Sequence, residues 1–491
     1  GTYTVAFTLP GFVTLKREGV EISTGVTANV GADMRVGGIE ETVTVTGASP
    51  VVDIQNVRTQ TVLTREALDA LPTNKTLQSF AALTLGAQMS QGANQDVGGN
   101  QGEAGGFGYF GVHGGRGNDQ RMMIEGMHFY ALIGNGAAGN RTNYVNQMAV
   151  AEQTIQTGGY GAEAETGGVQ INVVPRDGGN KFSGSTFTNG TSGKFQSSNL
   201  DDKLRGQGIT TSPNVKNIYD LGVGAGGPLK QDKLWFYTAH RRWGTKNTVP
   251  GMYFNATPGT GIYTADLDRP AFTWIHNRDH QARLTWQITD KMKLTASQGF
   301  QWDANEYYEV DRGRAPEGST WLQWSPNALT QTTWTYAKTN RMLIEAGQLS
   351  LWEDQTNSLV KNGDAGTMVG DSYAVDRKYV SISEIGGSFP NLYNGRANGI
   401  GQVDPGRGSR VHVFTQRASM SYITGSHAMK VGFQGLYSPA KSAAQMPEYS
   451  GLGPVQYVYR FGEPFQLRQW RSPLDRRNRV YVAGIFAQDQ W

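Results

Sequence analysis

Apolar and polar residues alternate along most of the chain after about residue 182. Between Gln281 and Thr289 the apolar residues all share one parity, at Ala282, Leu284, Trp286 and Ile288. The alternation continues beyond a turn at Asp290, and it recurs on both sides of a turn at Gly425 and Ser426. Successive side chains of a strand point to opposite faces, so this period of two predicts strands between an apolar and a polar environment.

About ten such strands are predicted, and the lengths of their connections alternate. The strands lie near residues 181–191, 214–226, 233–243, 279–289, 291–302, 328–338, 340–353, 412–424, 427–437 and 478–491. Connections after even-numbered strands are short, as in the sequences DK, TN and GS, whereas the others are long. Short turns at one end and long loops at the other are typical of a transmembrane β-barrel.

The first 180 residues follow other patterns. Short strands are predicted at Tyr3–Leu9, Val20–Ser23 and Ala28–Met34, which resemble the later part of a small β-sandwich. Thr42–Thr46 is an unbroken β-branched run set between flexible residues. A helix at Arg65–Ala70, a second around Leu77–Leu83, and strands at Arg121–Glu125, Glu152–Thr157 and Gln170–Val174 then predict a small α+β domain.

Composition narrows the class of protein. Charged residues make up 17% of the 491 residues, glycine occurs 65 times, and the net charge is +3. A balance so close to neutral indicates no nucleic-acid partner. The chain has no cysteine, which excludes disulfides, thiolate metal sites and cysteine nucleophiles within it.

The two ends of the chain suggest a piece of a longer protein. It opens without an initiator Met or a signal peptide. The last predicted strand ends at Trp491 with no partner for its edge, and backbone polar groups in lipid all need partners. We therefore expect further strands in the native protein.

Six stretches resemble the TonB-dependent outer-membrane transporters, and within them the Oar-like group with an N-terminal carboxypeptidase-regulatory-like domain. They are GTYTVAFTLPGF, VEISTGVTANVGADMRVG, LTREALDALPTNKTLQSFAALTLGAQ, RMMIEGMHFY, IQTGGYGAEAETGGVQINVVPRDGGNKFSGS and GGPLKQDKLWFYTAH. The expected fold is mainly β: a partial transmembrane antiparallel β-barrel with an α+β plug and a β-sandwich remnant. The resemblance implies a sandwich at 1–40, a linker at 41–55, a plug at 56–178 and a barrel at 179–491.

The resemblance also implies that residues 41–47 contain the TonB box, the segment that binds TonB in the periplasm. The six residues concerned are Glu41, Thr42, Val43, Thr44, Val45 and Thr46. Such a segment binds by adding a strand to a sheet of its partner, mainly through backbone hydrogen bonds. The alternative interpretation is that this run is only the last strand of the sandwich.

Other candidate site residues are fewer. The apical position of the plug loop in the family suggests substrate contact by Phe107, Tyr109, Phe110 and His113. Plug arginines Arg116, Arg121 and Arg176 are candidates to pair with carboxylates of the inner barrel wall. Aromatic clusters at 306–309, 320–324 and 455–461 suit ligand contact, a membrane-interface girdle or packing between loops.

Neither enzyme chemistry nor a metal site is indicated. His276 and His280 are four residues apart, but a zinc protease motif would need Glu after the first His and a helix. Asn277 follows His276, and a strand is predicted from about residue 279, so we expect His276 to lie in a loop. No cofactor is implied.

The function implied by the resemblance is active import across the outer membrane of a Gram-negative-type bacterium. Substrate would bind between the outer loops and the plug, TonB would supply energy, and lipid would surround the barrel. The alternative is an outer-membrane binding or adhesion protein without transport, which has no use for a TonB box.

Overall fold

The computed structural model describes most of the chain. The described residues are 2–9, 12–21, 32, 42–46, 59–71, 73, 77–81, 83–89, 110–116, 119–130, 145–207, 211–257, 260–308, 310–311, 313–359, 380–392, 409–444, 455–469, 471 and 474–491. Within these ranges, the helices are all too short or too polar to span a membrane.

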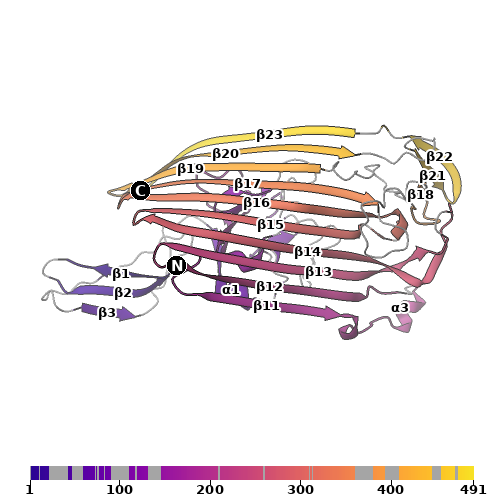
Figure 1. Ribbon diagram of the computed structural model, residues 1–491, viewed down its shortest axis with the longest axis horizontal. Helices are drawn as coiled ribbons and strands as arrows, with labels where there is room; N and C mark the ends of the chain where they lie inside the picture. Colours follow the sequence, from indigo (N-terminus) through magenta and orange to yellow (C-terminus); the bar gives the residue numbers. More distant parts are fainter. Residues whose placement is uncertain are drawn as a thin grey trace.

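One antiparallel sheet, here called the wall, contains all ten strands that the alternation predicts (Figure 1). Its members are β11 (Ser183–Ser192), β12 (Val215–Lys230), β13 (Leu234–Asn255), β14 (Ala265–Thr289), β15 (Met292–Tyr308), β16 (Thr320–Thr339), β17 (Met342–Leu359), β19 (Ser409–Thr424), β20 (His427–Ala444) and β23 (Leu474–Gln490). Each strand pairs with its neighbours in this order. The predicted number of strands is therefore confirmed.

Several strands are longer than predicted at the end of the long connections. Strand β14 begins at Ala265, whereas the alternation predicts a strand only from about residue 279. Ala271, Phe272 and Thr273 are all buried although they are consecutive. Where other segments cover both faces of a strand the period-two pattern disappears, and the sequence signal is lost.

The short turns all lie at one end of the wall. In Figure 1 they gather at the left, and the long connections gather at the right. The pairings Thr289 with Met292 and Thr424 with His427 close two of these turns. The alternation of connection lengths thus correctly predicted the polarity of the wall.

The two faces of the wall differ as predicted. On β14, Leu284 is 46% exposed and Trp286 is 42% exposed, whereas Arg283 and Thr285, which alternate with them, are 6% and 4% exposed. We call the face of Leu284 and Trp286 the outer face and the face of Arg283 the inner face. The outer face carries most of the exposed apolar side chains, and along Arg283 and Thr285 of β14 the inner face is polar.

A smaller domain, here called the plug (described residues between 59 and 178), lies against the inner face. Its mixed sheet has the order β4-β9-β10-β7-β8. The strands are β4 (Thr59–Thr64), β7 (Arg121–Ile124), β8 (Met127–His128), β9 (Val150–Gly158) and β10 (Gln170–Pro175), accompanied by α1 (Arg65–Ala70), α2 (Leu77–Ala81) and a pair formed by β5 (Ala87–Met89) and β6 (Phe110–Val112). The predicted helix and three strands are confirmed within one or two residues.

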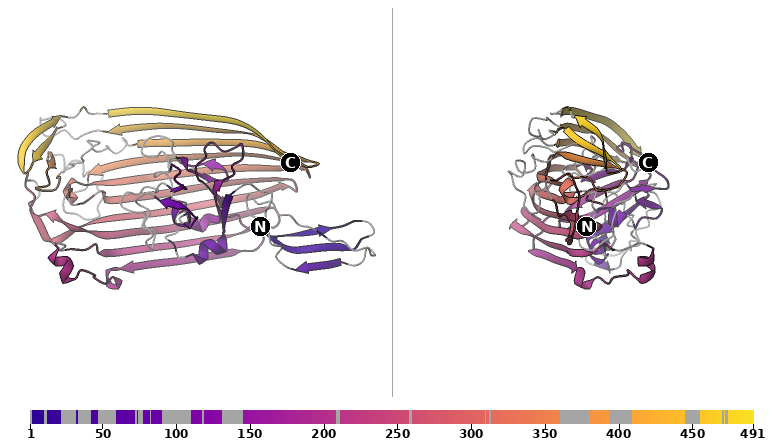
Figure 2. Two further views of the ribbon diagram at one scale, coloured as in Figure 1. Left: turned by 180° about the vertical axis from the view of Figure 1, so that it is seen from behind. Right: turned by 90° about the vertical axis from the view of Figure 1, so that its right-hand side faces the viewer.

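The plug and the wall share one apolar core. Leu68, Phe80 and Met122 of the plug are fully buried, and they belong to the same cluster as Leu349 and Val413 of the wall. Viewed along the strands in Figure 2, the wall curves around one side of the plug. Burial of this cluster stabilises the plug inside the wall by roughly 1.5–3 kcal/mol per large side chain.

A separate three-stranded sheet precedes the plug, with the order β1-β2-β3. It contains β1 (Thr2–Phe7), β2 (Thr14–Glu21) and β3 (Thr42–Thr46). The strand predicted at Ala28–Met34 lies outside the described residues, apart from position 32. Because β3 pairs with β2, this sheet extends beyond the predicted domain boundary at residue 40.

The long connections form a second folded layer, here called the cap. It includes the sheet of β18 (Ser381–Ile385), β21 (Val455–Arg460) and β22 (Glu463–Gln469), at the right of Figure 1, and the 3₁₀ turn η5 (Pro316–Gly318). Its core contains Met252, Phe254, Ala271, Phe272, Tyr307, Val310, Ala315, Ile382 and Leu392. Tyr308, Leu322 and Trp324 are buried together nearby. Tyr307, Tyr308 and Trp324 from the first two aromatic clusters predicted from the sequence are therefore buried in packing at the ends of β15 and β16.

Candidate functional site

The plug presents a polar face to the wall. Along β7, Met122 and Ile124 point into the core, while Arg121 and Met123 point the other way. Strand β10 repeats this pattern, with Ile171 buried in the core and polar neighbours on the opposite face. The period of two thus gives the plug sheet one face for folding and one face for contact with the wall.

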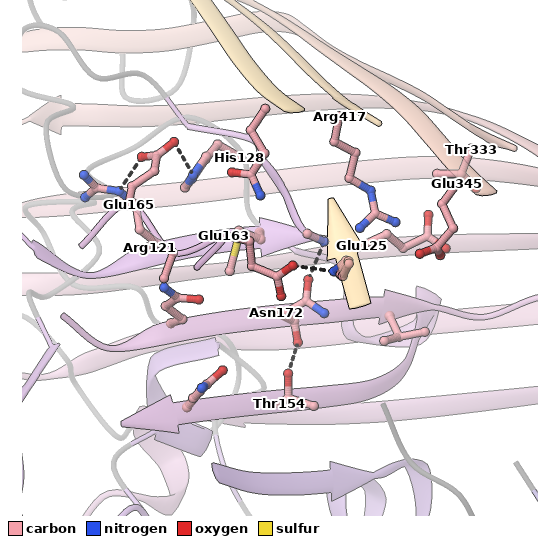
Figure 3. Close-up of a pocket in the computed structure, with 18 of the residues that line it drawn as sticks. Arg121, Glu125, His128, Thr154, Glu163, Glu165, Asn172, Thr333, Glu345 and Arg417 are labelled. Atoms are coloured by element: carbon pink, nitrogen blue, oxygen red, sulfur yellow. Dashed lines mark hydrogen bonds and ion pairs between the residues drawn. The ribbon is translucent and has the colours of Figure 1, made fainter. Parts of the chain in front are cut away.

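A cavity of about 510 Å³ separates this polar face from the inner face of the wall (Figure 3). Plug residues lining it include Arg121, Glu125, His128, Thr154, Glu163, Glu165 and Asn172, and wall residues include Lys293, Thr333, Glu345, Arg417 and Lys430. Lys293 and Lys430 are close in sequence to the short turns at Asp290 and Ser426. The cavity therefore lies toward the end of the wall that carries these turns.

Arg283 of the wall lies between two carboxylates of the plug region. Its Nη2 atom is 2.8 Å from Glu125 Oε1, and its Nε atom is 2.6 Å from Asp177 Oδ1. The same carboxylates also accept hydrogen bonds from Gln331 Nε2 at 2.7 Å and from Thr285 Oγ1 at 2.8 Å. A guanidinium that is almost fully buried is thus matched by charge and by hydrogen bonds, as a buried ion needs to be. We call Arg283, Glu125 and Asp177 the clamp.

The local backbone positions Glu125 for this contact. Glu125 and Gly126 form the turn between β7 and β8, and both have positive φ, at 49° and 73°. Glu125 N–H donates to Val173 O at 2.9 Å. The positive φ of Gly126 favours glycine at this turn, and a Cβ atom there would lie 2.9 Å from the flexible end of Arg417 of the wall.

A second ionic contact joins the plug to the wall at Lys430 and Glu163, and it lines the same cavity. Within the plug, Glu165 pairs with Arg121 Nε at 3.3 Å and with His128 Nε2 at 3.4 Å. The hydrogen bond with His128, helped by the charges of His128 and Arg121, lowers the pKa of Glu165 to about 2 against the opposing effect of burial.

Hydrogen bonds that are not part of ion pairs supplement the ionic contacts. Asn146 Nδ2 donates to Asp279 Oδ1 of the wall at 2.7 Å, and Tyr237 Oη donates to Met148 O at 2.9 Å. Thr415 Oγ1 donates to His128 O at 2.8 Å. Strands β13, β14 and β19 thus all bind the plug, so its position depends on contacts spread across the wall.

The plug arginines that the sequence suggested as partners of wall carboxylates have other surroundings. Arg121 is paired with Glu165 of the plug itself, and the Arg176 guanidinium lies 4.8 Å from the ring centroid of Tyr237 in the wall. Arg116 is exposed. In the clamp and at Lys430 the cation belongs to the wall and the carboxylates belong to the plug region, which is the reverse of the predicted polarity. Arg283 was detectable, because it occupies an inward parity on β14 beside Leu284.

The candidate substrate-contact residues are only partly described. Phe107 and Tyr109 lie outside the described residues. Phe110 is in β6, which pairs with β5, and His113 is exposed in the turn that follows. Their role stays a prediction.

The candidate TonB box forms a strand, as predicted. Thr42–Thr46 is β3, and it pairs in parallel with β2 from Thr14 to Glu18. Glu41 lies outside the described residues. This pairing is what the alternative interpretation, a last strand of the sandwich, requires. In the order β1-β2-β3 the strand is nevertheless at the edge of its sheet.

His276 and His280 are both in β14, so the expectation of a loop at His276 was wrong. His276 Nε2 is 3.2 Å from Glu306 Oε1, and His280 Nδ1 is 2.8 Å from His240 Nδ1. Throughout the part of the chain that the structure describes, no three His, Asp or Glu side chains are grouped to hold a metal ion.

A curved antiparallel wall with short turns at one end and a plug domain on its inner face is the architecture of outer-membrane transporter barrels. The chain is similar to the TonB-dependent transporter Oar of Myxococcus xanthus, with 28% identity over 248 residues, 48% of this chain and 21% of that protein. No family model matches the chain.

Solved structures show the same fold. The outer-membrane transporter YddB from Escherichia coli matches with a TM-score of 0.58 and 12% identity, over 88% of this chain and 54% of that chain. The siderophore receptor PirA from Acinetobacter baumannii matches with a TM-score of 0.51 and 14% identity, over the same shares. The chain thus spans about half the length of these structures and about a fifth of the curated relative.

The resemblance to TonB-dependent outer-membrane transporters is confirmed by the sequence likeness and by the fold, and the barrel is an outer-membrane one. The proteins that the chain resembles are transporters and receptors rather than enzymes, in agreement with the expectation from the sequence. The identity of the N-terminal sheet as a carboxypeptidase-regulatory-like domain stays a prediction.

Proposed function

We propose that this chain belongs to an energy-coupled importer in which the plug closes the barrel until TonB pulls on the N-terminal segment. The observation that supports this most directly is the clamp. Arg283 is buried between two plug-region carboxylates, and breaking such a contact without replacing it costs about 3–5 kcal/mol. A plug held in this way stays closed against thermal motion and opens only when work is done on it.

Within this proposal the domains keep the boundaries expected from the sequence, except that β3 joins the N-terminal sheet. Substrate would bind between the cap and the plug, where Phe107, Tyr109, Phe110 and His113 are the candidate contacts. The polar cavity between plug and wall would then become part of the route once the clamp opens. Its lining contains cations and carboxylates in similar numbers, so it favours neither sign of charge.

The TonB box would be Glu41–Thr46, of which β3 is the described part. Strand β3 shares only five register pairs with β2, and it lies at the edge of a three-stranded sheet. Small isolated sheets are marginally stable, and an edge strand offers its backbone groups to a further strand. TonB would bind either by adding to this edge or by taking the place of β2.

A reversible crosslink tests the proposal. Lys16 and Thr44 are register partners across β2 and β3, and the chain has no cysteine of its own that could interfere with a crosslink between them. In the complete protein, Lys16→Cys with Thr44→Cys should form a disulfide that holds β3 on β2, since register partners are close enough to be bridged. If TonB takes the place of β2, the purified periplasmic domain of TonB should bind the reduced form and not the oxidised form.

Two single variants complete the test. Val43→Pro should prevent binding of the TonB domain, because proline removes a backbone donor and fixes φ. Val43→Thr keeps the backbone donor and the freedom of φ, so it should bind normally. Normal binding by the proline variant would contradict a TonB box at this position. It would also favour the alternative, a binding or adhesion protein that needs no energy coupling.

A further inference from the structure

The outer face of the wall carries a band of aromatic residues at one height. Register partners form a continuous row across six strands: His240, His280, Phe300, Ala328, Trp352 and His412. Phe300 and Trp352 are exposed, and Tyr437 and Tyr481 are stacked at 4.6 Å on neighbouring strands. Such rows of aromatic side chains mark the membrane interface of outer-membrane barrels.

The height of this row agrees with that interpretation. His280 is ten residues from the turn at Asp290, which is roughly 33 Å along a strand and about 25 Å along the membrane normal at the usual tilt. Between them the outer face of β14 presents Ala282, Leu284, Trp286 and Ile288. The apolar band of a barrel is about 25 Å tall, so the row lies where the apolar band ends, on the side of the long connections.

At β13 and β14 the row consists of two histidines, and a pair of arginines lies just beyond them. His240 and His280 are directly opposite each other. Two residues further from the short turns, on the same face, Arg242 is directly opposite Arg278. Both arginines are exposed on the outer face. The Arg278 guanidinium lies 4.7 Å from the ring centroid of Trp302, and Arg242 is beside Tyr219. We call Arg242, Arg278, His240 and His280 the basic patch.

The basic patch lacks a counter-charge within the part of the chain that the structure describes. None of its four side chains forms an ion pair with a described carboxylate, and Arg242 and Arg278 are register partners. The neighbouring outer-face pair His276–Glu306 is already formed. Like charges directly opposite each other in an antiparallel sheet destabilise it, so this arrangement gains stability when an anion lies over it.

Another arginine at this height shows the contrast. Arg410 on β19 is two residues beyond His412 of the row and is also exposed on the outer face. It is opposite Asp354, and its Nε atom is 3.1 Å from Asp354 Oδ1. The wall therefore places a carboxylate opposite Arg410 and a second arginine opposite Arg242. The Arg242–Arg278 pair therefore carries positive charge with no carboxylate register partner.

We propose that the basic patch binds the phosphate groups of phosphorylated glycolipids in the outer leaflet of the outer membrane. Arginine pairs strongly with phosphate, through two parallel hydrogen bonds. The patch faces outward between the apolar band and the cap, at the depth of lipid headgroups, and Trp302 is an aromatic side chain suited to that interface. A phosphate held by lipid is delivered to this depth, whereas a free phosphate is not. The inference does not rest on transport.

The test uses the complete protein, isolated from its own outer membrane, with retained phosphorylated glycolipid counted by native mass spectrometry. Arg242→Gln with Arg278→Gln should lower retention at least about tenfold, which corresponds to the loss of one charge-assisted contact. Arg410→Gln is the matched control and should leave retention unchanged. Arg242→Lys with Arg278→Lys keeps the charge and should retain lipid, which separates loss of binding from loss of folding.

A second measurement identifies the source of the phosphate. The protein is reconstituted into bilayer discs with either the phosphorylated glycolipid or the same lipid after enzymatic dephosphorylation. Retention should require the phosphate, and millimolar inorganic phosphate should not displace the lipid. Equal retention of both lipids, or equal retention by the glutamine and wild-type proteins, would overturn the proposal. Tight binding of inorganic phosphate by lipid-free protein would assign the patch to a soluble anion instead and would also overturn it.

Discussion

Replacing Arg283 with methionine tests the clamp directly. Methionine keeps the length of the side chain but removes the charge and all three contacts of the guanidinium to Glu125 and Asp177. Loss of one partner of a buried pair costs about 3–5 kcal/mol. Gln331 and Thr285 still donate to the two carboxylates, so we expect a value near the lower limit. About 3 kcal/mol corresponds to a roughly 150-fold increase in the opening equilibrium of the plug.

The assay is native-state hydrogen exchange of the complete protein in lipid discs, followed at the amides of β7 and β10. Their exchange should accelerate by about that factor, because Glu125 directly follows β7 and Asp177 lies two residues after β10. Lys293→Met is the matched control. Lys293 Nζ is 4.0 Å from Asp177 Oδ2 and the side chain is 45% exposed, so its loss should cost less than about 1 kcal/mol.

The reasoning would be refuted by equal protection of β7 and β10 in the Arg283→Met and wild-type proteins. A third variant identifies the cause. Adding Glu125→Gln and Asp177→Asn to Arg283→Met removes the uncompensated charges as well, so part of the protection should return. If protection fell further instead, the loss of packing at Arg283, and not the loss of charge balance, would be responsible.

Three further predictions follow from the wall and the plug. Leu284→Arg places a charge on the lipid-facing side and should lower the folding yield in membranes by an amount equivalent to about 2–4 kcal/mol, whereas Gln287→Arg on the inner side should insert normally. Gly126→Ala should destabilise the plug by about 1–2 kcal/mol in chemical denaturation, because its φ is 73°. Glu165→Gln should destabilise the plug by about 1 kcal/mol at neutral pH, a value discounted for partial exposure of the carboxylate. Since the pKa of Glu165 is lowered to about 2, its contribution is present above about pH 4.5 and is lost as the pH falls toward 2, so the two proteins should converge there.

The wall was predictable because each of its strands separates two different environments. At Leu284 and its neighbours one face meets lipid and the other meets polar groups, and this contrast appears in the sequence as a period of two. The signal ends at Phe272, where the cap covers the outer face as well. Strand lengths on that side therefore depend on tertiary contacts that no local pattern reveals.

The clamp was missed for a different reason. The sequence shows that Arg283 points inward, but not that Glu125 and Asp177 lie opposite it, because those residues are more than 100 positions earlier in the chain. Conversely, the arginines suggested from the plug have partners other than wall carboxylates: Arg121 pairs with Glu165 of the plug, and Arg176 lies over the ring of Tyr237 in the wall. Pairing between domains depends on register across the whole wall, which alternation within single strands does not determine.

The shared core of the cap has a consequence for protein engineering. Residues from four separate connections, including Tyr263, Val310 and Ile382, pack in one cluster with the ends of three wall strands. Asn255 N–H, at the end of β13, donates to Glu317 Oε1 of the connection after β15 at 2.8 Å. Grafting one connection from a homologue would leave the other three with mismatched surfaces. Loops of this barrel would therefore have to be exchanged as a set, and natural sequence changes in one of them should be accompanied by changes in the others.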